Sequence, residues 1–149
     1  MDLIKRLPFC LVFSLFLGCS ESKITSPTPN SMVNRTIKCE GIIASPQKGK
    51  HFWLFVEELD SSSQTLYWPK EPEIIPDRFG HFSVEIFEDG IGENFTISLF
   101  SVEESGQKLI INWLKTGAES GNYPPMKDVI SAEKLSEVKN LKISKSLNK

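Results

Sequence analysis

Few side chains in this sequence have the types and spacing that catalysis or metal binding requires. The two histidines, His51 and His81, each begin an apolar segment and lack a paired spacing, whereas a zinc site needs three or four convergent ligands. No nucleophile motif or phosphate-binding loop occurs, and the two glycines within residues 89–93 are typical of a hairpin turn. We therefore expect no catalytic residue, no cofactor and no metal, and we expect that the protein is not an enzyme.

Acidic residues form three short clusters at the ends of apolar segments: Glu57-Glu58-Asp60, Glu88-Asp89 and Glu103-Glu104. They would bind calcium only if they met in space, because that ion takes six to eight oxygen ligands. We expect solvated edges instead, where charge discourages one sheet edge from pairing with another.

The three cysteines, Cys10, Cys19 and Cys39, stand in different surroundings. Before Cys19, two basic residues near the start are followed by an uncharged run over 8–18. This run is too short to span a bilayer as a helix, which takes roughly 20 apolar residues. It matches the positive and apolar regions of a secretory signal peptide.

The four residues Phe16-Leu17-Gly18-Cys19 resemble the lipobox of bacterial lipoproteins. The resemblance implies a signal peptide over 1–18, cleavage between Gly18 and Cys19, and a lipid (a diacylglycerol, with palmitate-type chains) on Cys19. More than one acyl chain gives stable membrane anchoring. Ser20 implies the outer membrane, facing the periplasm, if the source is Gram-negative.

Only Cys39 would then remain as a thiol, and its neighbours predict a small buried hydrophobic residue. A Cys19–Cys39 disulfide is the alternative. Residues 19–33 are rich in Ser, Thr and Pro, which predicts a lipid-anchored flexible linker of a few nanometres at roughly 3.1 Å per residue. The mature chain is weakly acidic, which disfavours nucleic acid as a partner.

From residue 34 to residue 145 the apolar residues mainly repeat every second position, between Gly- and Pro-containing breaks. This pattern predicts an all-β fold, an antiparallel β-sandwich, whose central strand is apolar on both faces over 52–56. Residues 105–115 instead have helical spacing, with Ser105 as N-cap and Gly117 just beyond the end. We expect a short strand at 65–69 and a last strand at 138–143.

The aromatic residues allow two interpretations. Exposed together they would stack on sugars or grip a peptide, whereas Trp53 and Phe82 lie in the most apolar segments and are expected in the core. We expect Trp68 to close the rim of the sandwich. The candidate binding surface comprises Tyr67, Trp68, Arg78 and Tyr123, together with the loops 60–64, 70–80 and 117–127.

The pair Trp68-Pro69 and the turn Asp77–Phe82 resemble positions of an Ig-like sandwich module found in several bacterial proteins, often exported or attached to larger chains. The resemblance implies an Ig-like fold and an accessory or binding role, and it carries no catalytic residue. We expect a membrane-anchored binding or assembly module of the envelope, with a protein or glycan partner. The alternatives are a small envelope hydrolase or enzyme inhibitor, and a purely structural envelope protein.

Overall fold

A computed structural model describes residues 21–89 and 94–144, which form an all-β body of two sheets and one helix. The predicted signal peptide and the lipobox Phe16–Cys19 lie outside the described residues. No helix in the described part of the chain is long and apolar enough to cross a lipid bilayer.

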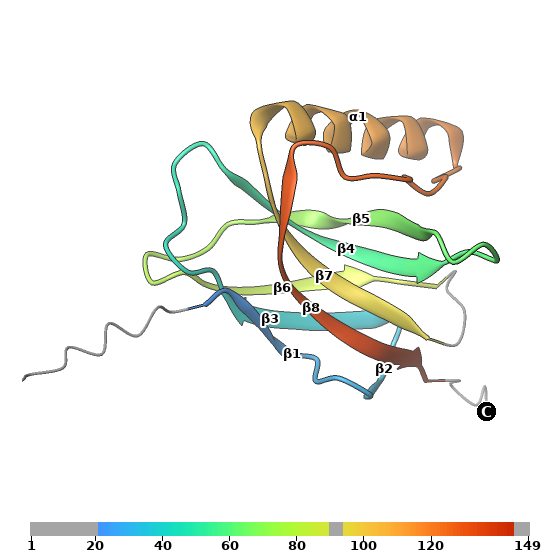
Figure 1. Ribbon diagram of the computed structural model, residues 1–149, viewed down its shortest axis with the longest axis horizontal. Helices are drawn as coiled ribbons and strands as arrows, with labels where there is room; N and C mark the ends of the chain where they lie inside the picture. Colours follow the sequence, from blue (N-terminus) through green and yellow to red (C-terminus); the bar gives the residue numbers. More distant parts are fainter. Residues whose placement is uncertain (1–20, 90–93, 145–149) are drawn as a thin grey trace, which may run out of the picture.

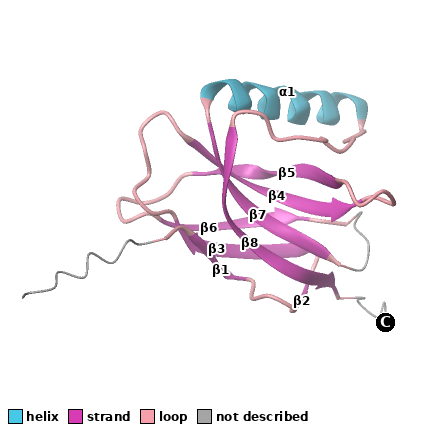
Figure 2. Ribbon diagram, in the orientation of Figure 1, coloured by secondary structure: helices cyan, strands magenta, loops and turns pink. Residues whose placement is uncertain are grey.

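The two sheets have three and five strands, in the orders β1-β3-β6 and β2-β8-β7-β4-β5 (Figures 1 and 2). All pairs are antiparallel except β2 with β8. The elements are β1 (Lys23–Ser26), β2 (Met32–Val33), β3 (Thr36–Ile42), β4 (His51–Leu59), β5 (Thr65–Ile74), β6 (His81–Phe87), β7 (Phe95–Val102), α1 (Glu104–Ser120) and β8 (Ala132–Ile143).

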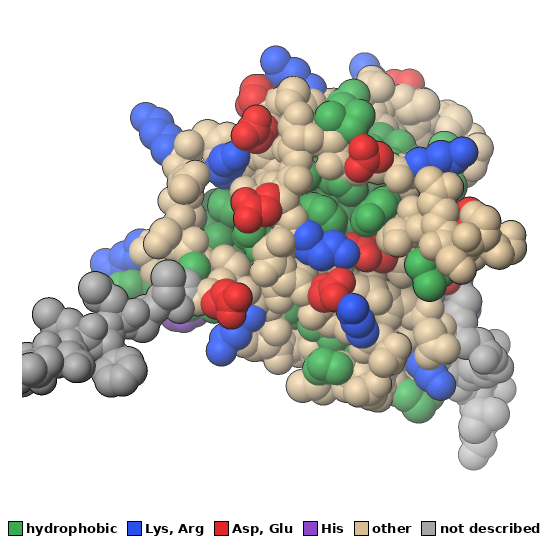
Figure 3. Space-filling view, in the orientation of Figure 1, with side chains coloured by type: hydrophobic (Ala, Val, Ile, Leu, Met, Phe, Trp, Pro, Cys, Tyr) green, Lys and Arg blue, Asp and Glu red, His purple; other side chains and the backbone are tan. Residues whose placement is uncertain are grey.

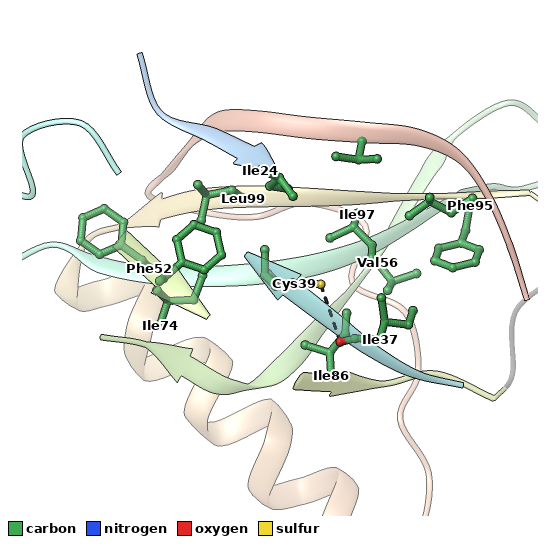
Figure 4. Close-up of a cluster of buried hydrophobic side chains, with 14 of the residues drawn as sticks. Ile24, Ile37, Cys39, Phe52, Val56, Ile74, Ile86, Phe95, Ile97 and Leu99 are labelled. Atoms are coloured by element: carbon green, nitrogen blue, oxygen red, sulfur yellow. Dashed lines mark hydrogen bonds between the residues drawn. The ribbon is translucent and has the colours of Figure 1, made fainter. Parts of the chain in front are cut away.

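The main core lies between the two sheets. Alternate residues of β3 and β6, including Ile37, Cys39 and Ile86, meet Val56 and Ile97 from the larger sheet (Figure 4). This confirms the period-two prediction, since successive side chains of a strand point to opposite faces. Burial raises the pKa of the Cys39 thiol to about 12, so the thiol is protonated and behaves as a small apolar group.

A second cluster lies on the outer face of the five-stranded sheet, under α1. It consists of Trp53, Phe55, Phe100, Val102 and Ile110, and we call it the helix-side cluster. Strand β4 is therefore apolar on both faces because each face has its own core. The prediction that Trp53 and Phe82 are core residues is confirmed, although Trp53 packs under the helix rather than between the sheets.

The helix is longer than its predicted range of 105–115, and both predicted caps are wrong. Glu103 is the N-cap and makes no side-chain capping hydrogen bond, and the helix continues through Gly117 to Ser120. Gly121 ends it in the left-handed region at φ 68° and donates its N–H to the Gly117 carbonyl, a geometry that glycine adopts without a Cβ penalty.

The prediction of a flexible linker over 19–33 is wrong for two stretches, which form strands. Lys23–Ser26 pairs with β3, and Met32–Val33 pairs with β8. Ile24 is buried in the main core and pairs with Gly41 on β3, where a Cβ would come within 2.4 Å of the Lys23 carbonyl oxygen and 2.6 Å of the Phe82 ring. A polar composition concealed these strands, because only one or two apolar residues in each meet the core.

Strand β5 continues through Pro69, beyond the brief strand expected at 65–69. The Tyr67 N–H points away from β4 and donates to the Met126 carbonyl at 2.9 Å. The nitrogen of Pro69, two residues on, faces the same outer edge, where no neighbouring strand needs a donor. Pro72 lies where the register with β4 shifts, between Lys70 and Ile74.

The prediction of a hairpin at 89–93 is also wrong, because the strands on either side of it do not pair with each other. Strand β6 belongs to the three-stranded sheet and β7 to the five-stranded sheet, so the connection between them joins the two sheets instead of two paired strands. Similarly, the last strand begins at Ala132, six residues before its predicted start.

Candidate functional site

A groove of about 520 Å³ runs between the outer edge of β5, the end of β6 and the C-terminal half of α1. We call it the aromatic groove. Its lining residues are Glu58, Trp68, Pro69, Lys70, Glu71, Phe87, Glu88, Asp89, Trp113, Leu114 and Tyr123. Rings from four of these residues, on three elements and one loop, therefore meet in one concave surface.

The loop after α1 shapes one wall of the groove. Gly121 turns the chain back, and Met126 then pairs with Tyr67 through two backbone hydrogen bonds of 2.8 and 2.9 Å. Between these two points, the Tyr123 ring lies directly on Gly117, where a Cβ would come within 2.2 Å of it. The helix thus needs a glycine inside its last turns so that Tyr123 can reach the Trp113 ring at 5.3 Å.

Both indole N–H groups of the groove donate to this same loop. Trp113 Nε1 donates to the Pro124 carbonyl at 2.8 Å, and Trp68 Nε1 donates to the Tyr123 carbonyl at 3.2 Å. These bonds fix the orientation of the two rings before any ligand arrives. The indoles offer a ligand their π surfaces, because their donors are already engaged.

Charge at the groove is mainly negative. Lys70 forms an ion pair with the buried Glu88 and also donates to the Phe87 carbonyl at 3.2 Å, which links β5 to the end of β6. Glu71 and Asp89 are exposed on the rim. A groove of this kind attracts cations, and its aromatic faces add cation–π attraction.

The structure brings together two of the four residues expected to form a binding surface. Trp68 and Tyr123 line the aromatic groove, and Trp68 is also half-buried at the sheet edge as expected. Tyr67 points to the opposite face, where its ring lies edge-on to Phe55 at 6.4 Å. Arg78 lies on the β5–β6 loop with its guanidinium 4.6 Å above the Phe79 ring, and it does not line the groove.

The three candidate loops also differ in structure. Residues 60–64 form a tight turn in which the Asp60 carboxylate accepts three hydrogen bonds from Ser62 and Gln64. Much of 70–80 belongs to β5, and 117–120 belongs to α1, so that only 121–127 is a loop of the groove.

Sequence reasoning missed Trp113 and Phe87 as groove residues. Trp113 has the helical spacing of a core residue, but its turn of α1 extends to the sheet edge, where the ring is only partly buried. Phe87 ends an alternating strand on its outward face and is 57% exposed. The signal that was available is the outward register of Phe87, because a strand predicted to bury Phe82 and Ile86 must expose Phe87.

A second groove, of about 410 Å³, contains a row of four alternating charges on β4 and β8. The Lys134 ammonium lies 2.7 and 2.9 Å from the two oxygens of Glu57 and 3.2 Å from Glu137, which pairs with Lys139 at 2.7 Å. Glu57 is buried, as is Glu88 in the aromatic groove, so the expectation that these two are solvated edge residues is wrong. Figure 3 shows acidic and basic side chains lying next to one another over the strands, below a hollow filled with hydrophobic groups.

Burial alone would lower the pKa of Lys134, but the hydrogen bonds and charges of Glu57 and Glu137 outweigh burial and raise it. The ammonium is therefore held protonated, which prevents it from acting as a general base. The Ser98 hydroxyl, on the β7 residue that pairs with Glu137 of β8, is buried without a hydrogen-bond partner.

His51 joins β4 to β5 and α1. Its Nδ1 lies 2.7 Å from Glu73 and its Nε2 lies 3.2 Å from Glu104. Gln107 donates to Glu73 at 2.8 Å and accepts from the Trp53 indole. The hydrogen bond with Glu73 is the main cause that raises the pKa of His51, so these contacts favour the protonated ring and make it a structural link between the strands and the helix.

No group of three or more His, Cys, Asp or Glu residues in the described part of the chain is placed to hold a metal ion. No model of a known protein family matches this chain, and no curated protein is similar to it in sequence.

Proposed function

We propose that this protein is a lipid-anchored envelope protein whose folded body is a binding module, rather than a hydrolase. The aromatic groove is the observation that carries the binding role. Two tryptophans, each fixed by a hydrogen bond to the 121–127 loop, line it together with Tyr123 and Phe87. Rings that are already ordered lose little entropy on binding.

The proposed ligand is a basic segment of a partner protein. Lysine and arginine side chains suit this groove because they can lie over the ring faces while their charge approaches the exposed carboxylates of Glu71 and Asp89. A glycan would use the ring faces alone, and it serves as the comparison ligand in the test.

The strand order supports the proposal that the body is Ig-like. The sheets β1-β3-β6 and β8-β7-β4-β5 follow the arrangement of strands A, B and E and of strands G, F, C and C′ in that fold. The short parallel pairing of β2 with β8 and the helix between β7 and β8 are additions to that framework.

Anchoring is proposed from the resemblance of Phe16–Cys19 to a lipobox, with cleavage after Gly18 and lipid on Cys19. Labelled palmitate should enter the wild-type protein and not the Cys19→Ser variant. Label that persists in the variant, or a wild-type protein that is soluble in the periplasm, would contradict the proposal. The outer membrane remains the proposed location if the source is Gram-negative.

The binding proposal is tested with the folded body alone, residues 21–149, by tryptophan fluorescence during titration with oligolysine and oligoarginine peptides. Oligoglutamate and a chito-oligosaccharide are the comparison ligands. The double variant Glu71→Lys/Asp89→Lys should weaken binding of the basic peptides at least tenfold, because it reverses the rim charge. Glu85→Lys/Glu133→Lys, which makes the same change of charge at two exposed positions on β6 and β8 outside the groove, is the matched control. Equal affinity of all three proteins, or preference for the glycan, would refute the basic ligand.

A further inference from the structure

The distance between the proposed lipid and the folded body is set by where the body begins. The chain is attached to the body from Ser22 onward, because the Ser22 hydroxyl accepts the Ala44 N–H at 2.8 Å and Lys23 pairs with Ile42. Cys19 stands three residues before Ser22. Three residues span at most roughly 10 Å, so a lipid on Cys19 would hold this end of the body at the bilayer surface.

Two loops share this end with the start of β1. The Ile43 N–H donates to the Gly80 carbonyl at 2.8 Å, which fastens the β5–β6 loop to the β3–β4 connection next to Ser22. Gly80 permits this contact, since a Cβ there would lie 2.2 Å from the Ile43 carbonyl oxygen. Figure 1 shows both connections on the same side of the body as the first strand.

The β5–β6 loop presents apolar side chains to its surroundings. Ile75 is 78% exposed and Phe79 is 64% exposed, and the Arg78 guanidinium lies 4.6 Å above the Phe79 ring. The Asp77 carboxylate accepts the N–H groups of Phe79 and His81 at 2.8 and 2.9 Å, which gives the loop a defined shape. Neither Ile75 nor Phe79 is part of the main core.

We propose that this end of the body, residues 43–50 and 75–80, is a membrane-contacting surface. Phe79 and Ile75 enter the headgroup region, and Arg78 with the exposed Lys48 contacts lipid phosphates. Aromatic and aliphatic side chains next to basic ones are what the bilayer interface accommodates. The inference rests on the proposed lipidation of Cys19. It also places the aromatic groove, at the far end of β6, about 20 Å away from the membrane.

The test uses the full lipidated protein in vesicles of phosphatidylethanolamine and phosphatidylglycerol. A nitroxide label is attached to Phe79→Cys or, as the matched control, to Leu59→Cys, which is 69% exposed at the far end of β4. Burial protects Cys39 from the label. The ratio of oxygen to aqueous nickel accessibility should be several-fold higher at position 79 than at position 59.

Mass spectrometry of the N-terminal peptide separates the two proposals. A lipidated Cys19 with equal accessibility at both positions would overturn the membrane-contacting surface alone. A Cys19 without lipid would overturn the anchor and, with it, this surface. A lipidated Cys19 with a buried label at position 79 supports both.

Discussion

His51 links β4 to β5 and α1, and its contribution to stability depends on pH. Its folded-state pKa is raised above the unfolded value of about 6.5, chiefly by the hydrogen bond with Glu73. The stabilisation is therefore complete below about pH 6.5 and is lost as the pH rises through the folded-state pKa.

We expect the free energy of unfolding, from urea titrations, to fall by about 1 kcal/mol more in the wild type than in Glu73→Gln between about pH 6 and about pH 9. The variant loses the carboxylate that holds the proton. Glu71→Gln, the same change at an exposed position of the same strand, is the control, because it leaves the links of His51 intact and should keep the wild-type pH dependence. Identical pH dependence in wild type and Glu73→Gln would contradict this role.

Lys134 neutralises a buried carboxylate on the outer face of the larger sheet. The Lys134→Met change should lower the free energy of unfolding by about 2 kcal/mol, because it leaves Glu57 buried without its ammonium. The double variant Glu57→Gln/Lys134→Met should recover part of that loss. If the double variant is as unstable as the sum of the two single variants, the two side chains are not coupled.

At the scale of elements, α1 and the 121–127 loop are in close contact at Gly117, where the Tyr123 ring packs on the helix. Alanine normally stabilises a helix interior by about 1 kcal/mol relative to glycine. Here Gly117→Ala should destabilise the protein, by roughly 1 to 3 kcal/mol, because the new Cβ meets the Tyr123 ring.

Thermal unfolding and tryptophan emission measure this effect, since the displaced loop also frees the indoles of Trp68 and Trp113. Thr116→Ala changes the preceding helical residue, which is exposed, and controls for helix propensity alone. A Gly117→Ala protein more stable than the wild type would show that Tyr123 does not need the space above the helix.

The elements that the sequence made predictable are those with a strong period. Phe82 and Ile86, or Phe95 and Leu99, alternate along whole strands, and the helical spacing around Ile110 indicated α1. The groove was predictable only in part. Trp68 and Tyr123 were expected at the surface, but their meeting depends on the turn at Gly121 and the pairing of Met126, which no local pattern encodes.

At the scale of the whole molecule, the N-terminal segment belongs to both sheets. Strand β1 extends the smaller sheet and β2 extends the larger one, and the Ile24 N–H donates to the Ser136 hydroxyl of β8 at 3.1 Å. The segment whose composition predicted a linker therefore connects the two sheets. It also determines how close the folded body lies to Cys19.

Removing this segment is the most direct test of its structural role. A chain of residues 34–149 should be less stable than one of residues 21–149 by about 3 kcal/mol or more, because it loses the burial of Ile24 and the backbone bonds of two strands. Urea unfolding of the two chains measures the difference, and Ile24→Ser in the longer chain isolates the core contact and should lose only part of it. Equal unfolding midpoints for the two chains would mean that residues 21–33 tether the body without stabilising it.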